Sequence, residues 1–350
     1  MPAVITHDLF AKDLYNELFE SIGGSRDEAE AFLLGNQGPD PLFFIGADPR
    51  YWQVRTLGSQ LHRQRPAELI VALKESVREL PAAERSVGRA YALGLVGHYT
   101  LDSTLHPFVN AQVRAICGAG VEGLTDEDTS EVHAAIETEL DELALTAKRG
   151  ETVATYNPAT ATLKGTESML DTVSRLYTLA VRRACDLVIP SGMFKSAVHA
   201  NRAANAALCS PSGVKRTLLG AAERLVRSHS MAQALSHRAQ ERHTSAFANE
   251  DHAPWIHPSL GTMSTASFWD LYEQARRSAL DAIATVDDDG FTMEDAEALT
   301  GGLNFYGEPV VAVIMAVEDA GTAASADEAP APADDEAPYV AAEPDDETEA

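Results

Sequence analysis

The chain of 350 residues is long enough for two hydrophobic cores, and with 45% hydrophobic and 23% charged residues it has the composition of a soluble globular protein. Its 27 Lys and Arg against 53 Asp and Glu give a net charge of −26, which argues against binding to duplex nucleic acid or, by electrostatics, to an anionic membrane surface. Because there is no long apolar run, no export signal and no CxxC pair among the three cysteines, we expect a cytoplasmic protein without transmembrane segments or disulfides.

Helical periodicity dominates the sequence, and no segment alternates apolar and polar residues as a half-buried strand does. Gly23 ends the first predicted helix, Ser25 caps the second, and Pro66 opens the third. Pro107 is expected to end a long apolar helix, because proline lacks the N–H that the helix needs. In chain order, we predict helices over residues 7–24, 25–37, 66–80, 84–106, 125–150, 167–187, 213–235 and 267–286, with loops over 36–52 and 237–264. The predicted fold class is therefore all-α, a multi-helix bundle with its metal site between core helices.

The composition changes sharply near the C-terminus. From Glu318 onward the chain carries twelve acidic residues and no basic one, and it consists mostly of Ala, Pro, Asp and Glu. Such a segment cannot bury enough apolar surface to offset the loss of chain entropy, so we predict a disordered acidic tail over residues 318–350. Residues 1–317 are expected to form the all-helical part, with the metal-site core in 1–190 and additional helices in 191–317.

Two histidine–carboxylate pairs lie four residues apart on predicted helices. His98, Asp102 and His106 follow one another at steps of four, which places them along one stripe of a helix. His133 and Glu137 repeat the spacing. Imidazole and carboxylate groups on successive turns can bind one metal ion from a rigid backbone, and a buried Asp needs a partner that a divalent cation can supply. The alternative is a hydrogen-bonded His–Asp network in the core.

Three further residues precede these pairs, namely His7 at the start of the first helix, Asp40 in a loop, and His62. In chain order the set becomes His, Asp, His, HxxxD, His and HxxxE. This order, together with the GPDPLFF loop at residues 38–44, resembles the zinc-dependent phospholipase C family, which shares its all-helical fold with fungal single-strand nucleases. The resemblance covers roughly residues 4–141.

The resemblance implies two or three zinc ions close together. The ligands would be imidazoles and carboxylates: His62, His98 and Asp102 for one ion; His106, His133 and Glu137 for a second; and His7, Asp102 and the amino terminus for a third. The implied activity is zinc-dependent hydrolysis of a phosphodiester, with a phospholipid or another phosphate ester as substrate.

Asp40 matches the residue that the family is proposed to use as general base or to orient the attacking water. The chain departs from the family at its first residues, Met1 and Pro2, where secreted members present a Trp. It also has Pro41 and Ser59 where choline-selective members carry aromatic residues, so the sequence does not support a choline pocket.

Two other functions are compatible with the same ligands. A single-strand nuclease or nucleotidase would use the same ions together with aromatic stacking surfaces. A non-catalytic helical protein would keep the metals as structural elements and turn over no phosphate ester.

Four histidines without paired spacing are expected at the surface: His199, His229, His237 and His243. Asp141, one turn beyond Glu137, is expected to orient a ligand imidazole. Trp255 is expected to anchor the loop over 237–264 on the core, and residues 286–290 are expected to form a turn rather than a calcium loop.

Overall fold

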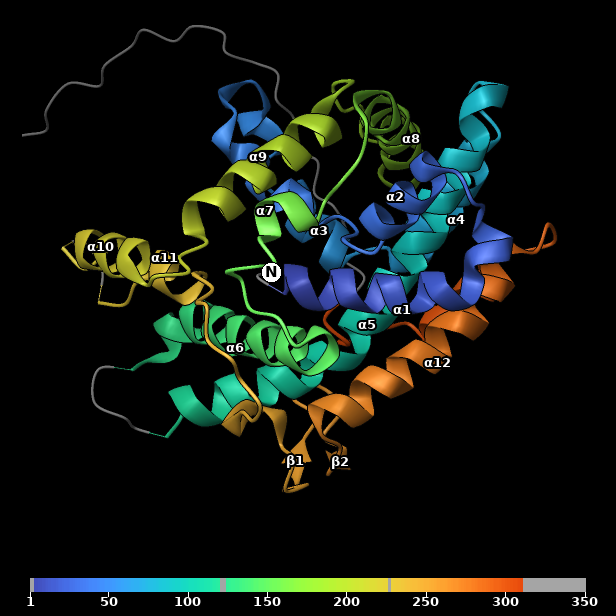
Figure 1. Cartoon of the computed structure of the whole chain (residues 1–350). Helices are drawn as coiled ribbons and strands as arrows, with labels where there is room; N and C mark the ends of the chain where they lie inside the picture. The colour runs from blue at the N-terminus through green and yellow to red at the C-terminus, as the bar shows by residue number, and fades with distance from the viewer. Residues whose placement is uncertain (1–2, 120–123, 226–227, 311–350) are drawn as a thin grey trace, which may run out of the picture. The chain divides into compact units, whose positions relative to one another are not determined.

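The computed structural model describes residues 3–119, 124–225 and 228–310, and helices dominate these ranges, which confirms the predicted all-α class (Figure 1). The α-helices are α1 (Val4–Ile22), α2 (Arg26–Gly35), α3 (Leu57–Arg63), α4 (Pro66–Val77), α5 (Arg85–Cys117), α6 (Thr129–Arg149), α7 (Pro158–Ala161), α8 (Glu167–Cys185), α9 (Met193–Leu208), α10 (Val214–Glu223), α11 (Met231–Ala234), α12 (Phe268–Asp287) and α13 (Met293–Thr300). The 3₁₀ turns are η1 (Asp40–Ala47), η2 (Pro49–Val54), η3 (Ala82–Glu84), η4 (Asp126–Asp128) and η5 (Ala246–Ala248), and β1 (Trp255–Ile256) pairs antiparallel with β2 (Met263–Ser264).

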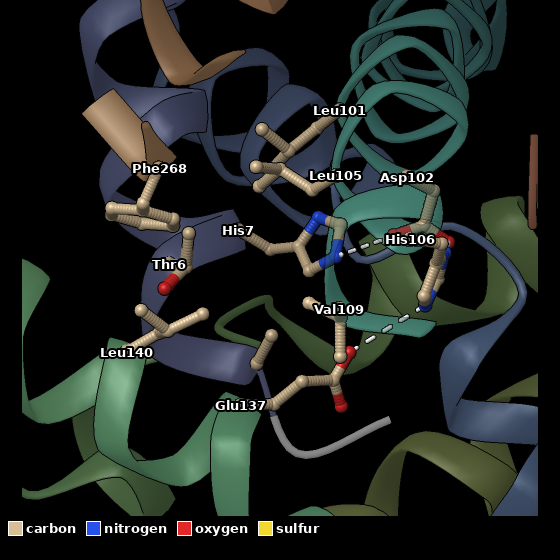
Figure 2. Close-up of a pocket in the computed structure, with 11 residues that line it drawn as sticks. Thr6, His7, Leu101, Asp102, Leu105, His106, Val109, Glu137, Leu140 and Phe268 are labelled. Atoms are coloured by element: carbon tan, nitrogen blue, oxygen red, sulfur yellow. Dashed lines mark ion pairs between the residues drawn. The ribbon is translucent and has the colours of Figure 1, made fainter. Parts of the chain in front are cut away.

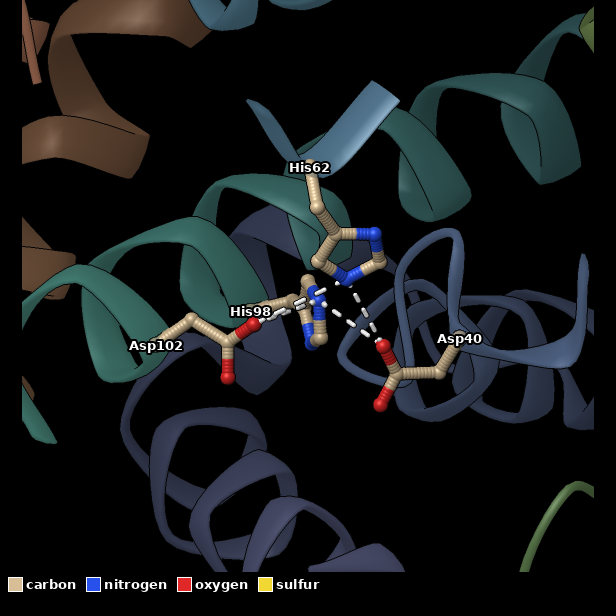
Figure 3. Close-up of side chains that lie close together, drawn as sticks. All are labelled: Asp40, His62, His98 and Asp102. Atoms are coloured by element: carbon tan, nitrogen blue, oxygen red, sulfur yellow. Dashed lines mark hydrogen bonds and ion pairs between the residues drawn. The ribbon is translucent and has the colours of Figure 1, made fainter. Parts of the chain in front are cut away.

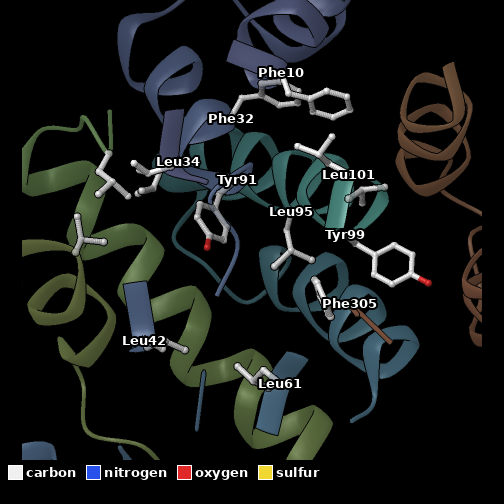
Figure 4. Packing of buried hydrophobic residues seen from close by; sticks show 14 of the residues in the cluster. Phe10, Phe32, Leu34, Leu42, Leu61, Tyr91, Leu95, Tyr99, Leu101 and Phe305 are labelled. Carbon is white, nitrogen blue, oxygen red and sulfur yellow. The ribbon is translucent and has the colours of Figure 1, made fainter. Parts of the chain in front are cut away.

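Helix α5 is the central element of the fold. It packs against α2 and α12, and it also contacts α4, α6 and α8. Every residue from Ala90 to Asp102 is buried, as expected for an apolar helix that neighbours surround. Figure 4 shows Tyr91 and Leu95 of α5 within the buried cluster, together with Phe32 of α2. None of the described helices combines the length and apolar character needed to cross a bilayer.

Two glycines bring α2 and α5 into backbone contact. A Cβ atom on Gly35 would lie 2.3 Å from the carbonyl oxygen of Tyr91, and one on Gly94 would lie 2.2 Å from that of Phe32. Any larger side chain would push the two helices apart. The close approach places Asn36, the residue after α2, beside the stretch of α5 that carries His98.

Pro107 does not end its helix, contrary to the prediction, because α5 continues to Cys117. Proline cannot donate to the carbonyl of Ser103, and the space beside it is filled by Gly307 from the end of the described chain. A Cβ atom on Gly307 would lie 2.5 Å from both the Ser103 carbonyl oxygen and Cγ of Pro107. Tertiary packing therefore supports the helix, and His106 stays in register with His98 and Asp102.

The prediction of a single helix over 213–235 is wrong, because the structure has two helices there, α10 and α11. Ser230 caps α11, and Glu223 accepts hydrogen bonds from the Ser230 hydroxyl and from the N–H of Ala232, so the chain turns back between the two helices. Four helices, α3, α7, α9 and α13, were not predicted. The loop over 237–264 is confirmed apart from η5 and the short hairpin, and Trp255 packs against Phe108 as expected. The predicted tail, 318–350, lies outside the described residues.

Candidate metal centre

The eight residues selected from the sequence converge on one region around α5. They come from five elements: His7 of α1, Asp40 of η1, His62 of α3, His98, Asp102 and His106 of α5, and His133 and Glu137 of α6. All are buried except His133, whose side chain is 17% exposed. Within each of two groups the potential ligand atoms lie within 4.8 Å of one another: Asp40, His62, His98 and Asp102 in the first, and His106, His133 and Glu137 in the second.

The first group places two carboxylates and two imidazoles around one point (Figure 3). Oδ1 of Asp40 lies 2.9 Å from Nε2 of His62 and 3.6 Å from Nε2 of His98. Oδ2 of Asp102 lies 3.2 Å from Nε2 of His98 and 3.8 Å from that of His62. Asp40, selected as a general base, is thus also within reach of an ion held by the other three.

Asp102 faces more than one site with its two oxygens. Its Oδ1 lies 3.0 Å from Nε2 of His7, while Oδ2 faces the first group and lies 3.8 Å from Nδ1 of His106 (Figure 2). A carboxylate in this position can bridge two cations. The amino terminus and Met1–Pro2, expected to complete a third site, lie outside the described residues.

The second group joins α5 to α6 through Glu137. Its Oε1 lies 3.0 Å from Nε2 of His133 and 3.5 Å from Nε2 of His106, and the two imidazole rings stack with centroids 5.5 Å apart. A cavity of about 30 Å³ lies between the groups, bounded by His7, Asp102, His106 and Glu137 among other residues (Figure 2).

Four of the histidines are held in the same way, with Nδ1 beside a neutral oxygen and Nε2 turned toward the carboxylates. The pairs at Nδ1 are His62 with the Gly58 carbonyl at 2.7 Å, His98 with the Asn36 carbonyl at 3.2 Å, His106 with the Phe305 carbonyl at 2.9 Å, and His133 with Asn110 Oδ1 at 3.1 Å. A neutral imidazole has one N–H. If Nδ1–H donates to these oxygens, the Nε2 lone pair of the neutral ring points at a carboxylate, which is favourable only with a metal cation or a second ring proton between them.

Gly38 makes room for this arrangement. Its φ is +52°, in the left-handed region, and a Cβ atom there would lie 2.1 Å from Cδ2 of the His98 ring. The backbone between Asn36 and Asp40 can therefore pass directly beside the imidazole only because this residue is glycine.

Two buried atoms at the centre lack hydrogen bonds within the described part of the chain. Oδ2 of Asp102 and Nε2 of His98 face each other at 3.2 Å, but they do not meet hydrogen-bond geometry. An unsatisfied buried polar atom is costly, and two such atoms facing a common point fit the donor set of a divalent ion.

The pKa shifts favour the protonation states that bind metal for most of these groups. Burial lowers the pKa of His98 to about 4, despite the nearby carboxylates, and it also lowers the pKa of His133. Burial alone would raise the pKa of Asp102, but the charges of His98 and His106 hold it well below its usual value, and His133 does the same for Glu137. His106 and His7 differ: burial opposes their charged forms, yet Asp102 and Glu137 raise the pKa of His106 to about 9, and Asp102 raises the pKa of His7.

This difference predicts a pH dependence of metal uptake at the second group. Below about pH 9, His106 of the metal-free protein carries a proton that a bound ion must displace, so affinity should rise by up to about tenfold per pH unit towards pH 9 and then level off. The first group should lack this contribution from His98, which is already neutral above about pH 4. Calorimetric zinc titrations at several pH values, in buffers of different ionisation enthalpy, would measure the released proton. Equal pH dependence of all the ions would contradict the prediction.

Asp141 plays a different part from the one expected. Its carboxylate accepts hydrogen bonds from the backbone N–H of Ile5 and Thr6 at 3.1 and 2.7 Å and from the Thr6 hydroxyl at 2.6 Å, so it caps the first turn of α1 rather than orienting a ligand imidazole. Its remaining partner is Nε2 of His237 at 2.9 Å, and His237 is buried, which overturns its predicted surface position. Asp141 therefore fixes the backbone that carries His7.

A groove of about 680 Å³ opens beside the second group, and His133 forms part of its wall. Its other lining residues include Phe43, Phe44, Arg63, Asn110, Arg114, Met231, Leu235, Tyr306 and Glu308. The Phe43 ring packs on His62 with centroids 4.9 Å apart, and the Tyr306 ring packs on His106 at 5.0 Å. The groove therefore connects solvent to the edge of the candidate centre.

The residues missed by sequence reasoning are the neutral partners of the imidazoles and the aromatic rings over them. Gly58 lies four residues before His62, in a helix that was not predicted, and Asn110 lies four residues after His106, beyond Pro107. Only a helical prediction extended over both segments would therefore have suggested them. Asn36, Phe305 and Tyr306 gave no such signal, because they reach the site from other elements.

Comparison with known proteins adds no family assignment: no family model matches the chain, and neither a curated protein nor a solved structure matches it. The likeness to zinc-dependent phospholipase C thus rests on the order of the residues themselves.

Proposed function

We propose that this protein is a zinc-dependent hydrolase of phosphate esters, similar to phospholipase C, that binds two or three ions around α5. The observation that carries the proposal is the common orientation of His62, His98, His106 and His133, each with Nδ1 at a neutral oxygen and Nε2 toward carboxylates. Neutral oxygens that accept the Nδ1 proton fix the tautomer whose Nε2 can bind metal. A hydrogen-bonded core network would be expected to satisfy Asp102 Oδ2 and His98 Nε2, which lack such bonds among the described residues.

Clustered zinc ions, when bound, would lower the pKa of water and stabilise negative charge on phosphate oxygens. In this scheme Asp40 accepts a proton from the attacking water, while Asp102 and Glu137 hold negative charge at fixed positions between the imidazoles. Burial raises the pKa of Tyr306, so its hydroxyl stays protonated and can donate a hydrogen bond to a phosphate oxygen. The Arg63 guanidinium lies over the Tyr306 ring, 5.3 Å from its centroid, and adds positive charge to the groove wall.

The groove suits a substrate with an apolar part next to its phosphate. Phe43, Phe44 and Met231 supply apolar wall, while Arg63 and Arg114 supply cations. A phospholipid fits this division. The aromatic rings also favour a second candidate, a single-strand nuclease or nucleotidase, because bases stack on such rings.

Zinc-loaded protein should release a phosphorylated headgroup from phospholipid vesicles, or p-nitrophenol from bis(p-nitrophenyl) phosphate, and lose this activity on chelation. Parallel assays with single-stranded DNA and nucleoside monophosphates would favour the second candidate if nucleosides or nucleotides were released faster. Stoichiometric zinc without turnover of any of these esters would instead indicate a non-catalytic protein in which the ions are structural.

A further inference from the structure

Two tyrosine hydroxyls lie buried beside the loop that carries Asp40. Tyr91 of α5 and Tyr177 of α8 are both 0% exposed, and Figure 4 shows the Tyr91 hydroxyl among apolar side chains. Oη of Tyr91 lies 3.1 Å from the Gly38 carbonyl oxygen and 3.1 Å from Oη of Tyr177. A hydroxyl removed from water costs free energy unless it is hydrogen-bonded, so the buried pair depends on the carbonyl of the loop.

One arrangement of protons satisfies all three groups. A carbonyl oxygen can only accept, and each phenol has a single proton to donate. Tyr177 therefore donates to Tyr91, and Tyr91 donates to Gly38. Burial raises the pKa of both phenols, so both protons are in place at neutral pH. The Gly38 carbonyl is thus the end of a short chain of hydrogen bonds that begins at α8.

Packing of three aromatic rings fixes the direction of the Tyr91 hydroxyl. The Tyr177 ring stacks on Phe194 of α9, with centroids 4.1 Å apart and an angle of 9° between the planes. The Tyr91 ring meets each of the other two edge-on, with centroids 5.7 Å apart. Because α5, α8 and α9 each contribute one ring to this buried cluster, the hydroxyl cannot turn away from Gly38 without displacing a neighbour.

The segment that receives this hydrogen bond also lies against the candidate centre. Gly38 has a φ of +52°, and a Cβ atom on it would lie 2.1 Å from Cδ2 of His98, so the same residue lies beside the imidazole and accepts from Tyr91. Two residues later, Oδ1 of Asp40 lies 2.9 Å from Nε2 of His62 and 3.6 Å from Nε2 of His98. A rotation of the peptide that follows Gly38 would therefore move Asp40 relative to both imidazoles.

We propose that Tyr91 is a positioning residue, whose hydrogen bond to the Gly38 carbonyl holds the loop so that Asp40 faces His62 and His98. A glycine can adopt many backbone conformations at little cost, and a hydrogen bond from the rigid core selects one of them. The catalytic part of the proposal rests on the proposed hydrolase activity, in which Asp40 accepts a proton, whereas the holding of the loop is a property of the metal-free chain. The alternative is that the two hydroxyls pair only to stabilise the core, in which case removing either would have the same effect.

The test compares Tyr91→Phe with Tyr177→Phe in the full-length protein. Both variants keep the aromatic ring and remove one hydroxyl, but only Tyr91→Phe removes the bond to Gly38. In zinc-free protein, hydrogen exchange of the amides in residues 37–42, measured relative to exchange in α12, should become about fivefold faster or more in Tyr91→Phe, the factor expected for one lost hydrogen bond. Tyr177→Phe should leave this ratio at the parent's value. The reference to α12 corrects for overall stability, which both variants are expected to lower.

With zinc bound, Tyr91→Phe should lower kcat for a phosphodiester by about tenfold while KM and zinc content stay at the parent's values, and Tyr177→Phe should not lower kcat. Equal effects of the two variants on loop exchange or on kcat would overturn the proposal, because the hydroxyls would then serve only the core. Unchanged loop exchange in Tyr91→Phe would overturn it as well. A zinc-loaded parent that hydrolyses no phosphodiester would refute the hydrolase instead, and the exchange comparison would still decide whether Tyr91 holds the loop.

Discussion

Removal of the metal ions is expected to lower the melting temperature by roughly 10 °C or more. Each ion bound about a thousandfold above its dissociation constant adds about 4 kcal/mol to the free energy of unfolding, and 1 kcal/mol shifts the melting temperature of a chain of this size by about 2–4 °C. Without ions, Asp102 would remain buried against the neutral imidazole of His98, and Glu137 would remain buried against that of His133. Calorimetry with and without a chelator, beside elemental analysis, measures the effect.

The variant Asp102→Asn should reproduce much of this loss, because the carboxylate faces His7, His98 and His106 and the neutral amide cannot bridge cations. Asp141→Asn is the matched control. Asp141 is also a buried aspartate, but its partners are backbone N–H groups, a hydroxyl and His237. The Asp141→Asn variant should lose stability while retaining the zinc of the two groups that contain His98 and His133. Less than one ion per chain in parent protein purified without chelator would contradict the metal centre itself.

The second large effect is expected at Asp40. If this carboxylate accepts the proton of the attacking water, Asp40→Asn should lower turnover of a phosphodiester by roughly 10²–10⁴, with little change in substrate binding. An amide has nearly the same size but cannot accept a proton at neutral pH. Steady-state rates and zinc content should be measured on the same preparations.

Zinc content separates a base from a ligand at this position. The contact of 2.9 Å between Asp40 and His62 allows either role. Loss of zinc as severe as in Asp102→Asn would make Asp40 a ligand and would refute the assigned role, and unchanged turnover would leave it as a turn residue. Asp48→Asn, which alters a more exposed aspartate in the same region paired with Arg50, controls for charge loss near η1.

Local spacing rules located five of the eight candidate ligands, those of α5 and α6, because a spacing of four repeats on a helix. The spacing of four places His98, Asp102 and His106 on one face of α5, and His133 and Glu137 on one face of α6. In the structure the two faces meet where His106 lies beside His133 and Glu137. The Ser25 cap located the start of α2, and helical periodicity located α12 to within one residue at each end.

The remaining features depend on contacts between distant segments. Pro107 reads as a helix end until Gly307 fills the gap beside it, and His237 reads as a surface residue until Asp141 meets it. Periodicity likewise shows that α10 is amphipathic, but the side that faces inward is decided by Gly220 and its neighbours on α11.

The backbone of Phe305 contacts two residues of the candidate centre, although it is synthesised long after them. Its N–H donates to the His62 carbonyl at 3.0 Å, and its carbonyl receives Nδ1 of His106 at 2.9 Å. A ribosome has added every proposed side-chain ligand by residue 137, yet the nascent protein lacks the group that orients His106 until residue 305 has emerged. If the centre binds zinc as proposed, capture in the final geometry therefore has to wait until residue 305 has been added, and earlier intermediates would present a partly assembled set of ligands that can exchange ions with their surroundings.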